Sequence, residues 1–100
     1  MVSHKREIFQ FLRENRGSIS SFGVTTLGLF GSFAQGRETD KSDIDLLVEF
    51  QPDQKSFDNF IGLAYYLEDQ LGRKVDLVTR DSLSPYLGPH ILREVEYLAP

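Results

Sequence analysis

The sequence predicts a small α/β (α+β) domain in which a mixed β-sheet is packed by helices. Three apolar segments of strand length alternate with stretches whose apolar residues recur every three or four positions, and short turn-forming connections join them. The predicted order is helix, strand, short helix, strand, helix, strand, helix. One hundred residues suffice for one hydrophobic core, so residues 1–100 are expected to form a single domain.

The first predicted helix begins with Ser3 as its N-cap and ends at about Asn15. Its apolar stripe contains Ile8, Phe9 and Leu12. The tetrapeptide 15–18 (Asn-Arg-Gly-Ser) is typical of a helix end. Residues 19–22 are therefore predicted to be a short connector.

Two strands and a tight turn follow. Residues 24–30 are apolar and β-branched enough to form a buried strand. After Gly31 and Ser32 a short helix is expected through Gln35, ended by Gly36, and residues 37–41 form a charged, exposed loop. The second strand is predicted over 43–50.

The remaining elements are a long helix, a strand and a last helix. Ser56 or Asp58 opens the long helix and Gly72 ends it, with one apolar face made of Phe57, Phe60, Ile61, Ala64, Leu67 and Leu71. Residues 74–79 form the third strand, and 81–89 a turn-rich crossing. A last helix is expected to begin near Pro89 and to carry Ile91, Leu92, Val95 and Leu98.

Composition excludes several classes of protein. A net charge of −4 argues against a nonspecific nucleic-acid surface, which needs a basic patch. The sequence has no apolar run near the roughly 20 residues of a membrane span, and its first residues lack the apolar region of a signal peptide. With no cysteine there is no disulfide framework. We expect a cytoplasmic protein with no membrane contact and no direct nucleic-acid binding.

Two acids stand two residues apart on the second predicted strand. Alternation over 43–50 places Asp43 and Asp45 on the face opposite Ile44 and Leu46, close enough to share a cation. Aspartate is disfavoured in strands, and the two like charges repel, which favours a metal site over a pair of solvated carboxylates. An EF-hand beginning at Asp40 is excluded because its glycine is missing and Ile44 stands at a ligand position.

A small-residue turn precedes these acids. Gly31 and Ser32 end the first strand, where backbone N–H groups and one hydroxyl can approach an anion closely. A simple tight turn is the alternative interpretation. A P-loop is excluded because Arg37 and Glu38 replace the Lys-Ser/Thr that follows its second glycine. The roles of Arg37 and Lys41, which either reach a triphosphate or are solvated, stay open.

Together, Gly31, Ser32, Gly36 and the run 42–48 (Ser-Asp-Ile-Asp-Leu-Leu-Val) resemble the signature of the DNA polymerase β-type nucleotidyltransferase superfamily. The short chain is similar to the minimal nucleotidyltransferases, the antitoxin partners of HEPN-domain toxins. The resemblance implies a nucleotidyltransferase, polymerase β palm-like fold. Many relatives have a basic residue where Phe33 or Gln35 stands, and here the turn lacks it.

A third acid lies on the last predicted strand. Val75 and Leu77 belong to the core, so Asp76 faces away from it, and it approaches Asp43 and Asp45 if the two strands are neighbours. Otherwise Asp76 is an exposed acid paired with a neighbouring cation. In the resembled superfamily a third acid on a later strand activates the attacking hydroxyl, and Asp76 matches it.

The expected function is metal-dependent transfer of a nucleoside monophosphate from a triphosphate to a hydroxyl. Asp43, Asp45 and Asp76 are the expected catalytic and metal-binding residues, with two Mg²⁺ ions, and Gly31 and Ser32 are expected to bind the nucleotide. The resemblance implies AMP transfer from ATP to a tyrosine of a HEPN-domain toxin, in a homo- or hetero-oligomer. The alternative is a catalytically idle antitoxin that neutralises its toxin by binding alone. A small-molecule acceptor needs a deeper pocket than this length readily provides.

Overall fold

A computed structural model describes residues 2–98 of the chain. Four strands form one sheet in the order β3-β2-β1-β4, made of β1 (Val24–Phe30), β2 (Ile44–Phe50), β3 (Val75–Thr79) and β4 (Glu96–Tyr97). Strand β1 is antiparallel to β2 and to β4, whereas β2 and β3 are parallel. The predicted mixed sheet is thereby confirmed, with one strand more than the sequence indicated.

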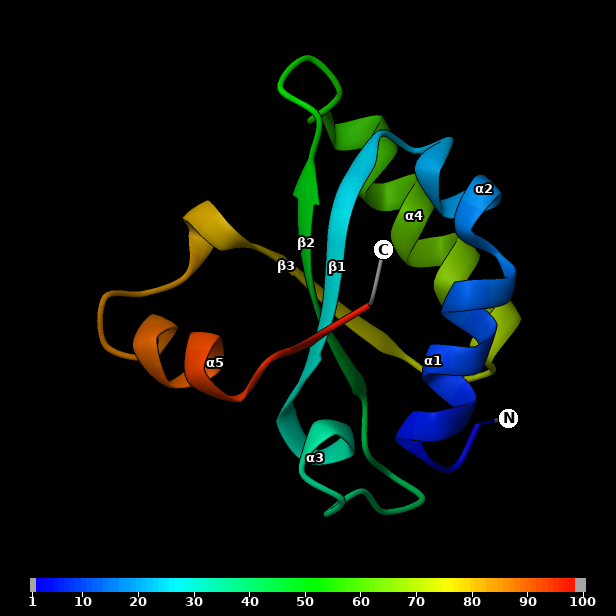
Figure 1. Cartoon of the computed structure of the whole chain (residues 1–100), viewed down its shortest axis with the longest axis vertical. Helices are drawn as coiled ribbons and strands as arrows, with labels where there is room; N and C mark the ends of the chain where they lie inside the picture. The colour runs from blue at the N-terminus through cyan, green and yellow to red at the C-terminus, as the bar shows by residue number, and fades with distance from the viewer. Residues whose placement is uncertain (1, 99–100) are drawn as a thin grey trace.

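The helices divide between the two sides of this sheet. Figure 1 shows α1 (Lys5–Glu14), α2 (Arg16–Ser20) and α4 (Phe57–Leu71) together on one side and α5 (Gly88–Glu94) on the other. A single-turn helix, α3 (Gly31–Ala34), follows β1, and a 3-10 turn, η1 (Arg80–Ser82), follows β3. Among the described residues, no helix combines the length and apolar character needed to cross a bilayer.

The core lies between the sheet and α1, α2 and α4. Alternate residues of the three long strands supply one wall of it, and the other wall comes from the apolar stripes of the helices. Its buried members are Ile8, Leu12, Ile19, Leu27, Leu29, Phe33, Ala34, Ile44, Leu46, Val48, Leu63, Leu67, Leu71, Val75 and Leu77. The intervening residues of β2 and β3 therefore face away from these helices.

The first helix begins later than predicted. Its N-cap is His4, and the backbone N–H groups of Ser3 and His4 both donate to Oε1 of Glu7, at 2.9 and 3.1 Å. The pKa of the Glu7 carboxyl is lowered chiefly by the hydrogen bond from Ser3, and the bond from His4 adds to this effect. Ser3 thus lies outside the helix because a side chain within the first turn already satisfies its N–H.

The predicted connector after α1 is wrong. The chain breaks only at Asn15, whose side-chain amide donates to the carbonyl of Phe11, and then forms α2. Glycine costs about 1 kcal/mol in a helix interior, which is why Gly17 suggested a helix end. Burial of Ile19, only 4% exposed, offsets that cost.

Helix α4 has the predicted bounds, but its buried face is rotated. The hydroxyl of Ser56 accepts from the N–H of Asn59 at 3.1 Å, and Gly72 ends the helix with φ 70°. The buried stripe is Leu63, Leu67 and Leu71. Because successive residues are rotated by about 100° around the helix axis, Phe57 lies about 80° from the centre of that stripe. Its side chain is 77% exposed. Its predicted place in the core is wrong.

The end of the chain differs most from the prediction. Helix α5 begins at Gly88, with Pro89 in its first turn as expected, but it ends at Glu94. Val95 and Leu98 are not helical: β4 pairs with β1, and the N–H of Leu98 donates to the carbonyl of Leu27 at 2.9 Å. Valine and tyrosine favour strands, and the new strand covers an edge of β1 that would otherwise be unpaired.

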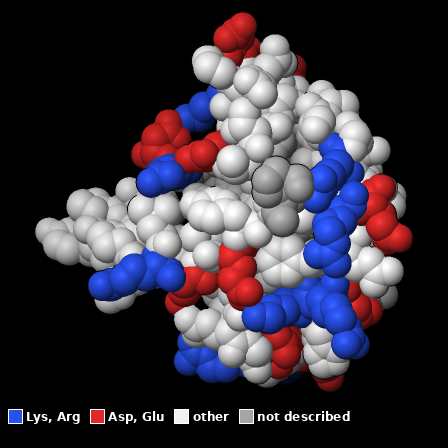
Figure 2. Space-filling model, in the orientation of Figure 1, with Lys and Arg blue, Asp and Glu red and all other residues white. Residues whose placement is uncertain are grey.

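Residues 80–94 form an arm that leaves the sheet after β3 and returns at β4. Figure 1 shows it projecting to the left, and Figure 2 shows that the tip is mostly uncharged. Within this arm, Tyr86 and Leu87 are 84% and 63% exposed. The arm rejoins the body where α5 packs on α3.

Candidate active site

Asp45 and Asp76 are direct neighbours in the sheet. Parallel pairing of β2 with β3 places Asp45 opposite Asp76, with strands about 4.8 Å apart. Both side chains face away from the core because the flanking residues Ile44, Leu46, Val75 and Leu77 are buried. The sequence left the partner of β3 open, and the structure places β3 beside β2. Asp43 lies one residue before β2 and is exposed.

The turn after β1 contacts the same carboxylate. Phe30 pairs with Asp45 across β1 and β2, and the next residue, Gly31, turns the chain with φ 74°. A Cβ built on Gly31 would lie 2.2 Å from Oδ2 of Asp45. The glycine is therefore required twice, for its left-handed backbone and for the space that the carboxylate occupies.

Ser32 is the second residue of α3 and lies beside this contact. Its carbonyl accepts from the N–H of Arg37 at 2.9 Å, which closes the turn. Its half-exposed hydroxyl makes no hydrogen bond with any residue that the structure describes. The structure thus brings together the predicted turn, Gly31 and Ser32, and the predicted acids.

The site concentrates negative charge. The pKa of Asp45 is raised to about 6, first by burial and then by the negative charges of Asp76, Asp43 and Glu94. Within residues 2–98 no ion pair neutralises Asp43, Asp45 or Asp76. The alternative pairing of Asp76 with Lys74 or Arg73 is not observed.

The donor set suits a hard divalent cation. Mg²⁺ prefers oxygen ligands and is usually held by one or two carboxylates together with substrate phosphates, and a cation would relieve the repulsion around Asp45. The described residues contain no group of three acids or histidines already gathered as a metal cage. The observed arrangement is an acidic surface beside a turn, with Asp45 at its centre.

One acid near Asp45 has no counterpart in the sequence-based prediction. Glu94, the last residue of α5, accepts from the N–H of Gly31 at 3.3 Å and from the side-chain amide of Gln35. Its position at the end of an amphipathic helix carries no local signal of such a role. Only the return of the arm to α3 brings it to the turn.

Arg73 organises the loop that leads into Asp43. Its guanidinium donates to the carbonyls of Thr39, Asp40 and Ser42 at 3.1–3.3 Å and to the carbonyl of Val2 at 2.7 Å. It also lies 5.2 Å from the centre of the Phe33 ring. Residues 37–41 are thus tied to the body from the start of β3, while Arg37 and Lys41 are exposed.

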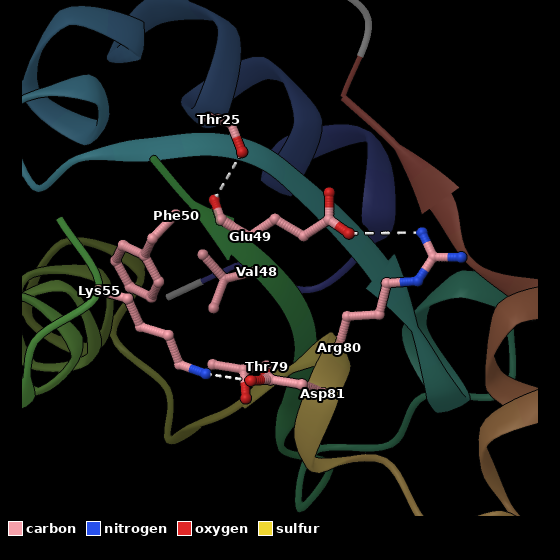
Figure 3. Close-up of a pocket in the computed structure, with 8 residues that line it drawn as sticks. All are labelled: Thr25, Val48, Glu49, Phe50, Lys55, Thr79, Arg80 and Asp81. Atoms are coloured by element: carbon pink, nitrogen blue, oxygen red, sulfur yellow. Dashed lines mark hydrogen bonds and ion pairs between the residues drawn. The ribbon is translucent and has the colours of Figure 1, made fainter. Parts of the chain in front are cut away.

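A cavity of about 400 Å³ lies at the other end of β2 and β3. Figure 3 shows two ion pairs there, Glu49 with Arg80 and Lys55 with Asp81, around Val48 and Phe50. Glu49 is four residues beyond Asp45, about 13 Å along the strand. None of the three aspartates lines this cavity.

Comparison with known proteins agrees with this geometry. A family model described as "Nucleotidyltransferase domain" matches residues 5–98. The chain is 41% identical to the protein adenylyltransferase MntA of Thermococcus cleftensis over 98 residues, covering 98% of this chain and 88% of that protein.

Two solved structures have a similar fold. A chain of a toxin–antitoxin complex with AMP-PNP is 29% identical, with a TM-score of 0.68, and the match covers 97% of this chain and 73% of that one. A chain from the structure of a tri-AMPylated Shewanella oneidensis HEPN toxin in complex with an MNT antitoxin is 23% identical. Its TM-score is 0.64 over 91% of this chain and 71% of that one, which shows a shared fold. This chain belongs to the nucleotidyltransferase domain family.

Proposed function

We propose that this chain is a protein adenylyltransferase that moves AMP from ATP to a tyrosine hydroxyl of a HEPN-domain toxin, and so acts as an antitoxin. The observation that carries the proposal is the placement of Asp45 directly against both Asp76 and Gly31. It is supported by the 41% identity to a protein adenylyltransferase. A cytoplasmic location fits a cysteine-free chain that uses ATP.

Each site residue then has a distinct task. Asp43 and Asp45 would hold Mg²⁺, and with two ions bound Asp76 would be a ligand of the second. Bound Mg²⁺ would neutralise charge on the phosphates during an in-line displacement. The backbone of Gly31 and the free hydroxyl of Ser32 hydrogen-bond the phosphates, as small-residue turns do for anions.

Asp76 is also the proposed general base. It removes the proton from the acceptor hydroxyl while that oxygen forms a bond to the α-phosphorus, and the bond from the α-phosphorus to the bridging oxygen breaks. Pyrophosphate leaves, and the acceptor keeps AMP. Asp76 is exposed on the sheet face away from the core, which leaves room for the acceptor side chain of another protein to approach.

The competing function is neutralisation by contact alone. The arm of residues 80–94 exposes the large apolar side chains Tyr86 and Leu87, and a binding module would also present such a surface. The two functions differ in one respect, because a binding module needs neither ATP nor intact aspartates.

The decisive experiment incubates the chain with a HEPN-domain toxin, Mg²⁺ and each of the four nucleoside triphosphates in turn. Intact mass spectrometry of the toxin should show a gain of one or more AMP groups with ATP alone. The double variant Asp43→Asn with Asp45→Asn is the control and should give no gain. If the wild type and the double variant both abolish toxin activity without any change in the mass of the toxin, the chain is a binding module instead.

A further inference from the structure

Glu94 occupies hydrogen-bond donors of the nucleotide turn. It is half-buried at the end of α5, and its carboxylate accepts from the backbone N–H of Gly31 and from the amide of Gln35. Figure 1 shows the end of α5 beside the lower end of β1, where this turn lies. A residue 63 positions away in sequence thus fills the place where the turn presents a donor to an anion.

The charge of Glu94 is not compensated locally. No cation pairs with it within the part of the chain that the structure describes, and its partner Gln35 is neutral. Its field reaches Asp45. An arriving triphosphate would therefore meet a carboxylate of like sign that already holds the Gly31 N–H. Both anions cannot accept from that one donor at full strength.

We propose that Glu94 is an internal competitor of the nucleotide, which holds the Gly31 turn until the phosphates displace it and release the end of α5. The inference rests on the proposed function, because it assumes that the turn binds phosphate. It adds that the arm is coupled to the site: the state of Glu94 links nucleotide occupancy to the position of residues 80–94.

This coupling has a structural basis in how the arm is attached. Helix α5 packs on α3. The carboxylate of Glu94 accepts hydrogen bonds from Gly31, the first residue of α3, and from Gln35, the residue that follows this helix. On the other side, Val95 packs against Gly28, where an added Cβ would lie 2.5 Å from the valine Cγ2. Release of Glu94 frees α5 from the turn, while β4 stays paired with β1.

The test compares the wild type with Glu94→Gln and Glu94→Ala by titration calorimetry with ATP, once in EDTA and once in Mg²⁺. Removing the competing charge should tighten ATP binding by about tenfold in both buffers, the scale of one charge-assisted hydrogen bond. Glu96→Gln is the matched control. It removes a carboxylate two residues further on, whose partner is Lys5 and not the turn, and should change affinity by less than about twofold.

Hydrogen exchange supplies a second readout on the wild type. Saturating ATP should increase exchange at the amides of α5 and leave those of β4 unchanged. Unchanged or weaker ATP binding by both Glu94 variants would overturn the inference. Weakening confined to Mg²⁺ would instead make Glu94 a metal ligand. A wild type that binds no nucleotide in Mg²⁺ and transfers none would overturn the proposed function itself.

Discussion

Gly31 and Asp45 are in contact so close that a methyl group on the glycine would lie 2.2 Å from Oδ2 of the aspartate. The turn and the acid are therefore one structural unit. The left-handed backbone of Gly31 and the half-buried position of Asp45 depend on each other. The carboxylate of Asp45 fits against the turn because Gly31 has no side chain.

Gly31→Ala should be strongly destabilising. The positive φ alone costs about 1–2 kcal/mol for a residue with a Cβ, and the clash with Asp45 adds to it. Gly36→Ala is a matched control, because Gly36 has φ 70° but nothing within 4 Å of the added Cβ. Urea denaturation should show a larger loss of unfolding free energy for Gly31→Ala than for Gly36→Ala.

The same pair can be tested by a double variant. In an Asp45→Ala background the nearest carboxylate atoms are gone, so the cost of Gly31→Ala should fall toward that of Gly36→Ala. Equal costs in both backgrounds would show that Asp45 moves freely away, and that the contact is not restrictive.

Stability should depend on the ionisation of Asp45. Because burial and nearby acids raise its pKa to about 6 from an unfolded value of 3.8, the folded state keeps the proton longer. The contribution of the Asp45 carboxyl to the free energy of unfolding is therefore fully present below about pH 4, where the group is protonated. It is lost as pH rises through about 6. Asp45→Asn should raise Tm at pH 7.5 and have little effect near pH 4.

Differential scanning calorimetry across pH 4–8 measures this effect. Asp53→Asn, in an exposed loop, removes the same charge and should leave the pH profile of Tm unchanged. Mg²⁺ should raise Tm of the wild type at pH 7.5 and not that of Asp45→Asn. A lower Tm for Asp45→Asn throughout the range would mean that the carboxylate is a structural acceptor.

Asp76→Asn should separate chemistry from binding. The amide cannot accept the acceptor proton, so AMP transfer should fall by roughly 10²–10⁴-fold, the usual range for a lost general base. Affinity for Mg²⁺ and ATP should be retained through Asp43, Asp45 and the turn. Calorimetry and single-turnover transfer on this variant test both statements. If binding and transfer are both lost, Asp76 is chiefly a metal ligand, and if both survive, it has no role.

Arg73→Lys should loosen the loop before Asp43. Lysine keeps the charge but has one donor nitrogen, whereas Arg73 uses Nη1 for the carbonyls of Thr39, Asp40 and Ser42 and Nε for that of Val2. A loss of about 1–3 kcal/mol is expected from these bonds, with faster hydrogen exchange over 39–43. Arg13→Lys, at an exposed position of α1, is the control. Unchanged exchange in the loop would show that Arg73 does not organise it.

Local patterns predicted most elements because the forces that define them act within a few residues. The Ser56 cap and the Gly72 end delimit α4, and β1 has its predicted bounds, Val24–Phe30. Failures occurred where a distant partner decided the outcome. Around Gly17 the sequence indicates a helix end, but burial of Ile19 stabilises a second short helix there. Glu96 and Tyr97 form a strand because they pair with the otherwise free edge of β1.

Local pattern was enough to show which side chains share a face: alternation places Asp45 and Asp76 away from the core, and the turn at Gly31 follows from its residue types. The folded chain is needed to see that β3 lies beside β2, which makes Asp76 the neighbour of Asp45. Folding likewise brings Glu94 to Gly31 and Arg73 to the loop at 39–42. Side-chain parity is a property of one strand, whereas strand order and contacts between residues 31 to 63 positions apart depend on how the whole chain closes its core.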